Sequence, residues 1–351
     1  MKKLLFCVLI PLFLMGESRI EIVAPFHNPM TQESERLSKM LEEKGFPATV
    51  ISTDLSHYEG LKKKEGRLGK LQRKFSLDFP HKIEPDKDVA KIVFWNITYE
   101  FRRKLCLGKL PKDRMVMFVW EPPTLFPKMF SKSLTKYFSR IYTWEDDVID
   151  NKTYFKFYYP VLQPMRDEIP AFEDKKFCTL VAGNPPRKYY GRSGELYSER
   201  VRAIDFFEKV GEKGFEFYGR SWDKEKHPAY LGKAGNKLET IKNYRFAICY
   251  ENTGTSNGYV TEKIFDCFAA GIVPVYLGAP NIEKYVPKTC FIDRRDFASM
   301  EDLYAFMKAM TKEEYNAYLQ SIRDFLSSKQ AQLFSRENFE QIFFEAVTTK
   351  N

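Results

Sequence analysis

The amino-acid sequence predicts an α/β protein made of two Rossmann-like, doubly wound domains that face each other across a cleft. Short apolar runs alternate with amphipathic helical patterns along most of the chain, which is typical of parallel sheets covered by helices. A proline-bearing stretch, FYYPVLQPMRDEIPAFEDKK, interrupts this alternation near the middle. The chain has 351 residues, so each side of this stretch is long enough for a core of ordinary size.

The first half of the chain contains apolar runs that we expect to form buried strands. Two helices are expected between them, one over residues 32–44, which ends at Gly45, and one over 98–107. The strands are expected at IEIVAP (20–25), ATVIST (48–53), KIVFWN (91–96), MVMFVW (115–120) and RIYTW (140–144).

The second half of the chain repeats the alternation of strands and helices. Helices are expected over 195–210, 237–244 and 262–270, and further helices from residue 300 onward. The strands are expected at FCTLVAGN (177–184), FEFYG (215–219), RFAICY (245–250) and IVPVYLG (272–278).

These patterns also set the expected domain boundaries. We expect an N-terminal α/β domain over residues 19–165, a C-terminal α/β domain over 175–325 and a C-terminal helical segment over 326–351. Doubly wound sheets bind ligands at the carboxyl ends of their strands, and the cleft between two such domains is the default site.

The N-terminus carries two lysines and then an apolar stretch from Leu4 to Met15. This stretch is too short for a comfortable transmembrane helix and matches the apolar region of a secretory signal peptide. We therefore expect residues 1–18 to be an export signal or an uncleaved membrane attachment, with a buried first strand as a further alternative.

The net charge of +9 favours anionic partners, such as phosphates, nucleotides, acidic glycans or an anionic membrane face. The densest basic run, Lys62 to Lys74, is either a solvated surface or a contact with a membrane or an acidic acceptor. The sequence contains no zinc-finger spacing, RNA-binding signature or basic heptads, so nucleic acid is not an expected partner.

Several cofactor motifs are also missing from the sequence. No GxGxxG follows the first strand, and no GxxxxGK[ST] is present. The six cysteines have no CxxC and no zinc-site spacing, so we expect them to be small buried residues. The acidic cluster WEDDV (144–148) is expected to be a surface turn rather than a metal site.

A candidate anion site lies in YENTGTSNGYVTEKIFDCFAAGIVPVYLGAP (250–280). Thr261 is a good N-cap for the helix that follows, and Gly271 is a natural residue after its end. The first turn presents unpaired N–H groups and the positive end of the helix dipole, to which Lys263 adds a full charge.

The residues beside this helix start suit a sugar nucleotide. Glu262 can accept two hydroxyl hydrogen bonds from a ribose diol, and Tyr259 could stack on, or hydrogen-bond to, a base or sugar. Alternatively, the pattern is purely structural, because a capped helix with Glu and Lys in its first turn is common.

The stretch from FAICYENTG through TEKIFDCFAAGIVPVYLG to FIDRRDF resembles the donor-binding signature of glycosyltransferase family 10, the α-1,3-fucosyltransferases. WEPPTLFP resembles the family's Glu-Ser-Pro segment, and IYTWEDDVIDNKTYFKFYYP resembles the stretch after it. LVAGNPPRK with SERVRAIDFF resembles the segment that carries a phosphate-binding arginine. The resemblance covers roughly residues 92–297.

The resemblance implies an inverting transferase of GT-B fold, with an N-terminal acceptor-binding domain and a C-terminal nucleotide-sugar-binding domain. It implies GDP-fucose as the donor, a glycan as the acceptor and no required cofactor. By position, the implied site residues are Lys263 and Arg200 for the diphosphate (with Arg202 as a rival arginine), Glu262 for the ribose, Asn252 and Tyr259 for the nucleotide-sugar pocket, and Glu121 as the general base.

This sequence departs from the family pattern in places. The loop between Asn252 and Tyr259 is one residue longer than expected, WEPP replaces Glu-Ser-Pro, and the two-cysteine pattern that closes animal members is missing. The resemblance therefore supports the donor class more directly than the sugar or the linkage.

The MKK start of the sequence looks bacterial.

Two alternatives remain beside fucosyl transfer: the same fold with a different GDP-sugar donor, and a non-catalytic glycan- or membrane-binding protein on this scaffold. The expected acceptor is an oligosaccharide, lipopolysaccharide or glycolipid. Because GDP sugars are cytosolic in bacteria, we expect association with the cytoplasmic face of a membrane, through Leu4–Met15 and Lys62–Lys74.

Overall fold

The computed structural model describes residues 19–25, 29–53, 89–96, 111–127 and 129–349. These residues form two compact units. The first contains the described residues up to Val119 together with 129–142 and 344–349, and the second contains Trp120–Pro127 and Thr143–Phe343.

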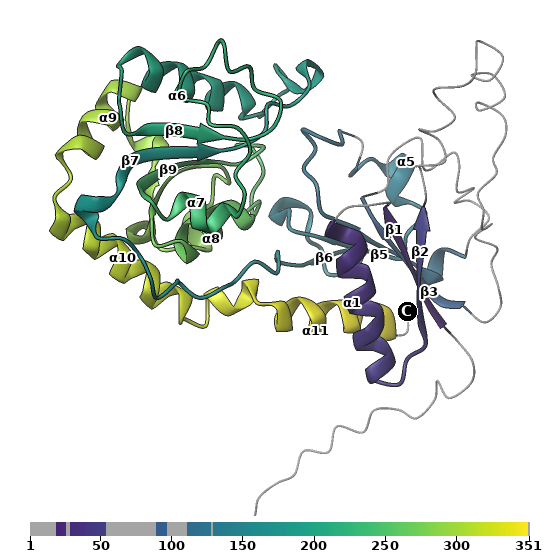
Figure 1. Ribbon diagram of the computed structural model, residues 1–351. Coiled ribbons are helices and arrows are strands. Elements are labelled where there is room, and N and C mark those ends of the chain that lie inside the picture. The colour runs from purple at the N-terminus through teal and green to yellow at the C-terminus, as the bar shows by residue number, and fades with distance from the viewer. Residues whose placement is uncertain (1–18, 26–28, 54–88, 97–110, 128, 350–351) are drawn as a thin grey trace, which may run out of the picture. The chain divides into compact units, whose positions relative to one another are not determined.

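The first sheet has the strand order β2-β1-β3-β4-β5-β6 (Figure 1). The neighbours β1 and β2, β1 and β3, and β3 and β4 run parallel. Helix α1 contacts β1 and β2. The strands and helices are β1 (Arg19–Pro25), α1 (Pro29–Glu43), β2 (Ala48–Thr53), β3 (Val89–Trp95), β4 (Met115–Val119), α5 (Lys132–Thr135), β5 (Arg140–Thr143) and β6 (Tyr154–Lys156).

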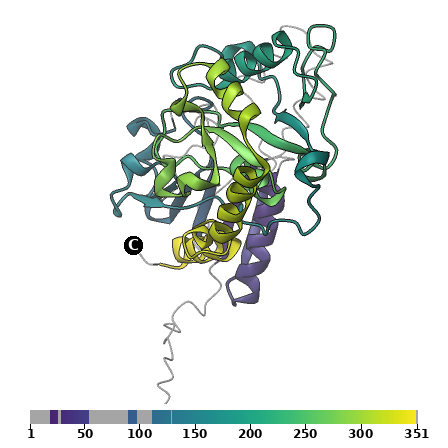
Figure 2. The same ribbon diagram turned by 90° about the vertical axis from the view of Figure 1, so that its left-hand side faces the viewer.

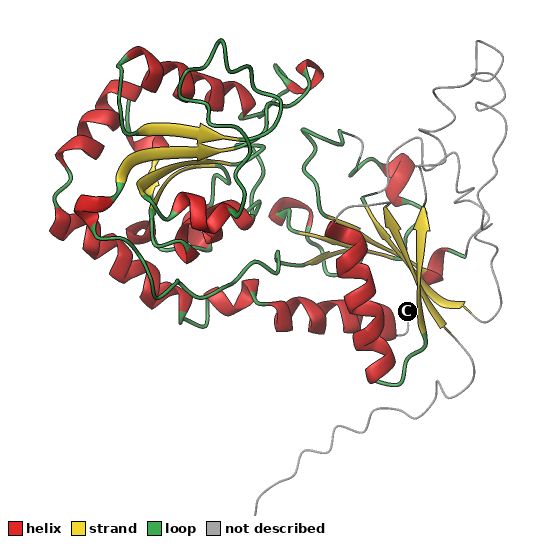
Figure 3. Ribbon diagram, in the orientation of Figure 1, coloured by secondary structure: helices red, strands yellow, loops and turns green. Residues whose placement is uncertain are grey.

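The second sheet has the order β11-β10-β9-β7-β8, and its strands are all parallel. Helices cover both of its faces, with α6 on one side and α7 and α8 on the other (Figures 1 and 3). The elements are β7 (Lys176–Val181), α6 (Tyr197–Lys209), β8 (Phe215–Tyr218), α7 (Lys237–Ile241), β9 (Tyr244–Tyr250), α8 (Glu262–Ala269), β10 (Val273–Leu277), β11 (Ile292–Asp293), α9 (Met300–Ala309), α10 (Lys312–Leu326) and α11 (Arg336–Thr348).

The core of the second unit lies between its sheet and these helices. Strand β9 is almost entirely buried, as expected of a central parallel strand covered on both faces. Phe265 of α8 packs against Phe325 and Phe334, with ring centroids 6.2 and 4.8 Å apart. Burying each such side chain stabilises the fold by about 2 kcal/mol. Figure 2 views this unit with α9 and α10 in front of the strands.

The strands and helices predicted in the described regions are confirmed, although α7 is shorter than predicted and the short strand β6 was not predicted. The helix expected at 98–107 and the segment 1–18 lie outside the described residues. The boundary between the two units lies near residue 143 and not at the predicted 165–175. Residues after Thr143 pack on the second unit, where the Val161 N–H donates to the Phe334 carbonyl at 3.0 Å.

Candidate active site

The order of the second sheet reverses between two neighbouring strands. The chain adds β8 on one side of β7 and then β9, β10 and β11 in turn on the other side. At such a switch point the loops after the two strands separate. Open α/β sheets bind their ligands there, beyond the carboxyl ends of the strands.

A pocket enclosing ≈ 380 Å³, part of it open to solvent, lies at this switch point. Its apolar lining comes from the ends of β7 and β9 and from Ile241 and Cys267 of α7 and α8. Its charged lining consists of Arg200, Lys237 and Lys263, and no carboxylate from the described part of the chain lines it. Three cations around one pocket favour an anionic ligand.

Arg200 is held in place by the end of β9. Its side chain is buried, and it donates hydrogen bonds to the carbonyl oxygens of Tyr250 at 2.7 Å and Glu251 at 2.8 Å. A further bond of 3.0 Å reaches the side-chain oxygen of Asn252. All of these acceptors are neutral, so the bonds orient the guanidinium group and leave its positive charge available to an anion.

The rival arginine points away from the pocket. Arg202 lies two residues after Arg200 on α6, which places it about 200° further around the helix. Its side chain is 69% exposed and pairs with Glu199. The structure therefore brings Arg200, and not Arg202, to the pocket.

Helix α8 begins at Glu262, and Thr261 is its N-cap, as the sequence predicts. The Thr261 hydroxyl accepts a hydrogen bond from the Lys263 backbone N–H. The Lys263 ammonium group lies 3.1 Å from a Glu251 carboxylate oxygen and 3.2 Å from a Glu262 carboxylate oxygen. Burial opposes its charge, but the two carboxylates outweigh burial and raise the pKa of Lys263. Lys263 therefore stays charged beside the N–H groups of the first turn.

Glu251 is a site residue that the sequence analysis missed. It is fully buried, and its carboxylate accepts hydrogen bonds from the Thr261 N–H at 3.0 Å and the Thr261 hydroxyl at 2.8 Å. It thereby fixes both the start of α8 and the position of Lys263. A carboxylate at the end of the apolar run RFAICY was the available signal, because such a buried charge needs a partner.

Glu262 lies on the solvent side of this cluster, with its side chain half exposed. Desolvation opposes its ionisation, but the charges of Lys263 and Lys237 outweigh it and lower the pKa of Glu262 to about 2. Glu262 is therefore an ionised hydrogen-bond acceptor beside Lys263, which lines the pocket. Lys237, which was also missed, forms an ion pair with Asp266 at 2.6 Å.

Asn252 and Tyr259 lie at the two ends of the 252–259 loop. Tyr259 is 2% exposed, and its ring packs against Trp144 and Tyr159 at centroid distances of 4.6 and 6.0 Å. The Asn252 amide donates a hydrogen bond of 3.4 Å to the Tyr259 hydroxyl. Because protein covers its ring, Tyr259 positions Asn252 and does not offer a stacking face to a base.

Glu121 lies in a turn directly after β4, and this turn belongs to the second unit. The backbone before it is fixed by two hydrogen bonds. The Trp120 carbonyl accepts the Trp144 indole N–H at 3.0 Å and also accepts the Tyr159 hydroxyl. The aromatic cluster that holds Tyr259 therefore also holds the start of the Glu121 turn.

The charged residues around the start of α8 shift the pKa of Glu121. Burial raises the pKa of its carboxyl; the charge of Lys263 opposes this rise, and the charges of Glu262 and Glu251 add to it. The structure therefore brings these predicted residues into one region of the second unit: Glu121, Arg200, Asn252, Tyr259, Glu262 and Lys263.

The sequence was compared with models of known protein families and with known proteins. Residues 195–343 match the family model "Glycosyltransferase family 10 (fucosyltransferase) C-term". The resemblance to glycosyltransferase family 10 is confirmed. The alpha-(1,3)-fucosyltransferase FucT of Helicobacter pylori is 36% identical over 84 residues, which cover 24% of this chain and 17% of that protein.

A longer match covers more of the chain. The 4-galactosyl-N-acetylglucosaminide 3-alpha-L-fucosyltransferase 9 of Mus musculus is 26% identical over 223 residues, which cover 61% of this chain and 55% of that protein. The chain thus spans about half of the length of the mouse relative and a smaller share of the Helicobacter pylori one.

Solved structures that match this chain have low sequence identity to it and therefore show its fold alone. A crystal structure of an α1,3-fucosyltransferase matches with a TM-score of 0.57 at 14% identity, covering 96% of this chain and 92% of that one. The N-terminal domain of Candida albicans trehalose-6-phosphate phosphatase matches with a TM-score of 0.55 at 10% identity, covering 95% and 97%. The predicted α/β fold of GT-B class is confirmed.

The 252–259 loop is held in place by contacts with Asp146. The Asp146 N–H donates to the Asn257 carbonyl at 3.1 Å. The Asp146 carboxylate accepts the Asn281 amide at 2.7 Å, and the Asn281 side-chain oxygen accepts the Gly258 N–H at 2.8 Å. Asp146 thus connects to the loop both directly and through Asn281.

The same carboxylate is paired with Lys156 at 2.7 Å and accepts the Tyr285 hydroxyl at 2.6 Å. Burial opposes its ionisation, but the hydrogen bonds from these two groups outweigh burial and lower the pKa of Asp146 to about 2. The expected turn at WEDDV forms, but the prediction of a surface feature is wrong, because Glu145 is buried and Asp146 organises the 252–259 loop.

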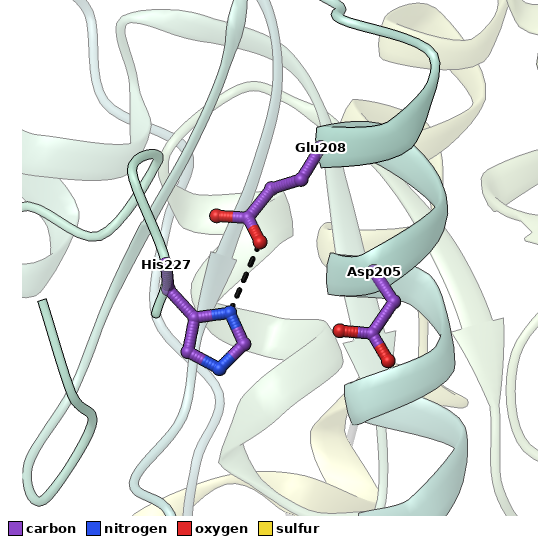
Figure 4. A group of neighbouring side chains, drawn as sticks. All are labelled: Asp205, Glu208 and His227. Atoms are coloured by element: carbon purple, nitrogen blue, oxygen red, sulfur yellow. Dashed lines mark hydrogen bonds and ion pairs between the residues drawn. The ribbon is translucent and has the colours of Figure 1, made fainter. Parts of the chain in front are cut away.

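Figure 4 shows another charged cluster, formed by Asp205 and Glu208 of α6 and by His227. Their potential ligand atoms lie within 4.8 Å of one another, a spacing that a metal ion could bridge. Glu208 already uses both oxygens, because one lies 3.0 Å from His227 Nδ1 and the other accepts the Ala229 N–H at 3.0 Å. The cluster anchors a loop to α6, and we assign no metal to it.

The membrane expectation concerns segments outside the described residues, Leu4–Met15 and Lys62–Lys74. Among the helices that the structure describes, none combines the length and the apolar character needed to cross a bilayer.

Proposed function

We propose that this protein transfers fucose from GDP-fucose to a hydroxyl group of a glycan, with inversion at the anomeric carbon. The observation that carries this proposal is the pocket at the β7–β9 switch point. Its cations Arg200 and Lys263 lie within residues 195–343, the region matched by the fucosyltransferase model.

The pocket suits the leaving group of such a reaction. As the bond between the anomeric carbon and the phosphate oxygen breaks, its electron pair leaves with GDP and negative charge grows on the diphosphate. Arg200, Lys263 and the N–H groups of the first turn of α8 stabilise that charge, and they are fixed before the donor arrives. Glu262 is available to accept the ribose hydroxyls.

Glu121 is proposed to act as the general base. It takes the proton from the acceptor hydroxyl while that oxygen forms its bond to the anomeric carbon. Burial raises the pKa of the Glu121 carboxyl, and a raised pKa makes its carboxylate a stronger base.

The proposed acceptor is an oligosaccharide, lipopolysaccharide or glycolipid, and the proposed location is the cytoplasmic face of a membrane. The positive net charge of +9 and the segments Leu4–Met15 and Lys62–Lys74 support a contact with an anionic surface.

A panel of nucleotide sugars tests the donor. Thermal melting of the protein is measured with GDP-fucose, GDP-mannose, a UDP sugar and GDP, since a ligand that binds only the folded state raises the melting temperature. We expect GDP and GDP-fucose to raise it and the UDP sugar to leave it unchanged. A larger rise with GDP-mannose would favour a different GDP-sugar donor, and no rise with any compound would favour a non-catalytic binding protein.

A further inference from the structure

Residues 191–196, the segment that leads toward α6, lie against the 252–259 loop. The Gly194 carbonyl accepts the Gly254 N–H at 2.8 Å, and the Asn252 carbonyl accepts the Leu196 N–H at 3.3 Å. An antiparallel bridge joins the two segments between these contacts. The segment is thus hydrogen-bonded along the loop that carries Asn252.

The approach of the two segments is close. Gly194 has a φ of +75°, a conformation that favours glycine, and a Cβ added there would collide with the Thr255 side chain. The position of the 191–196 segment is therefore defined by the loop that it touches.

The same segment contacts the turn that carries Glu121. The Arg192 guanidinium donates hydrogen bonds to the carbonyl oxygens of Thr124 at 2.5 Å and Leu125 at 3.5 Å. A further bond of 3.0 Å to the Lys188 carbonyl and a position 4.7 Å from the centroid of the Tyr189 ring fix the guanidinium itself. Hydrogen bonds from a charged donor are about twice as strong as neutral ones.

The turn that receives these bonds is short. The Pro122 carbonyl accepts the Leu125 and Phe126 N–H groups at 3.0 Å each, and Thr124 is buried. Glu121 directly precedes Pro122, the first residue of this turn. A shift of the Thr124–Leu125 carbonyls would therefore be passed to Glu121 over a few stiff bonds.

We propose that Arg192 is a positioning residue that sets Glu121 relative to the 252–259 loop and the pocket cations. The inference rests on the proposed function in one respect, the role of Glu121 as base. The 191–196 segment ties the loop to the turn, so the base and the donor-binding loop share one support. A base displaced by about 1 Å can lose roughly a hundredfold in rate.

The first test is kinetic, with Arg192→Ala, the conservative Arg192→Lys and the exposed Arg187→Ala as the matched control. We expect Arg192→Ala to lower kcat by roughly 10- to 100-fold while GDP affinity changes by less than about twofold, because no donor-binding group is removed. The acid limb of the pH–rate profile of Arg192→Ala should move to lower pH, because a Glu121 carboxyl that is held less firmly is better solvated and has a lower pKa. Arg192→Lys should restore part of kcat, and Arg187→Ala should match wild type.

The second test does not depend on activity. Hydrogen exchange of the Leu125 and Phe126 amides is measured in full-length wild type and in the same variants. We expect faster exchange in Arg192→Ala only. Unchanged exchange, or equal losses of kcat and GDP affinity, would overturn the inference. Absence of fucosyl transfer by wild type, with the exchange difference present, would instead refute the proposed function and leave the anchoring role of Arg192 standing.

Discussion

At the scale of single residues, Arg200 and Arg202 show what decides a binding role. Both lie in SERVRAIDFF, and the sequence leaves their register open. The helix resolves it, because Arg200 faces the buried end of β9 while Arg202 faces solvent. The role of an arginine here depends on the helix face, which a sequence pattern without a fixed register does not specify.

This pair gives a matched test of the diphosphate site. We expect Arg200→Ala to weaken GDP binding by about 10- to 100-fold, since a hydrogen bond to a charged group contributes about 1.5 to 3 kcal/mol. Arg202→Ala should change the affinity by less than about twofold. Titration calorimetry with GDP measures both, and equal effects of the two substitutions would contradict the assignment.

Glu145 gives a prediction about pH. It is 8% exposed, and burial, opposed in part by a hydrogen bond from Ser256, raises the pKa of its carboxyl from 4.5 to about 7. The folded state therefore holds the proton more tightly than the unfolded chain does. The stability that Glu145 contributes is complete below pH 4.5 and is lost as the pH rises to about 7, by about 3 kcal/mol in total.

Glu145→Gln removes this titration. We expect the variant to melt at a higher temperature than wild type at about pH 8 and at nearly the same temperature near pH 4.5, with the difference growing between them. Scanning calorimetry over this pH range measures it, with the exposed Glu225→Gln as control. A difference that is independent of pH would show that Glu145 is not neutral in the folded state.

At the scale of elements, the network around Asp146 explains how a polar loop is ordered. The expected helices and strands came from local periodicity, and this worked for α8 and β9 because their signals lie within a few residues. The partners of Asp146 do not, since Asn281 and Tyr285 lie more than a hundred positions away along the chain. No local pattern reveals such contacts, and WEDDV was therefore predicted to be a surface turn.

Two lysines that pair with Asp146 test this network. Lys156 lies 2.7 Å from Asp146 with its side chain 17% exposed, whereas Lys284 lies 3.3 Å away and is 63% exposed. We expect Lys156→Met to destabilise the protein by about 3 kcal/mol, because it leaves a largely buried carboxylate without its main partner. Lys284→Met should cost less than about 1 kcal/mol.

Denaturant unfolding followed by tryptophan fluorescence measures both lysine variants. The unfolding of the second unit should shift in Lys156→Met, and GDP affinity should fall with it because the 252–259 loop is loosened. Equal stabilities of the two variants would contradict a role for Asp146 as the anchor of the loop.

At the scale of the whole molecule, the sequence was sufficient to predict two α/β units, most of their strands in order along the chain and the resemblance to glycosyltransferase family 10. The sequence was not sufficient to predict which residues meet around the pocket. Glu251 and Lys237 gain their roles from the switch-point topology, which brings the ends of β7 and β9 beside three helices, and Arg192 gains its role from the Thr124 and Leu125 carbonyls. Charged residues meet there from positions that are far apart in the chain.

The overall charge gives a prediction at this scale. The chain carries a net charge of +9, and three cations line the pocket. We expect GDP affinity to fall as NaCl rises from about 0.05 to 0.5 M, because salt screens charges that are only partly buried. GMP, with one phosphate fewer, should show a shallower dependence. Identical salt dependence of GDP and GMP in calorimetry would argue against a diphosphate at the pocket cations.

The role of Glu121 in an inverting transfer is tested most directly by measuring fucosyl transfer by wild type and Glu121→Gln. Transfer from GDP-fucose to a panel of glycan acceptors is followed by GDP release and by the anomeric configuration of the product, and GDP binding is measured in parallel. We predict that wild type forms a product of inverted configuration, with kcat falling as acid protonates Glu121. Glu121→Gln should lose at least about a hundredfold in kcat with GDP affinity within about twofold. Wild-type turnover by Glu121→Gln, or a retained configuration, would contradict inverting transfer with Glu121 as the base.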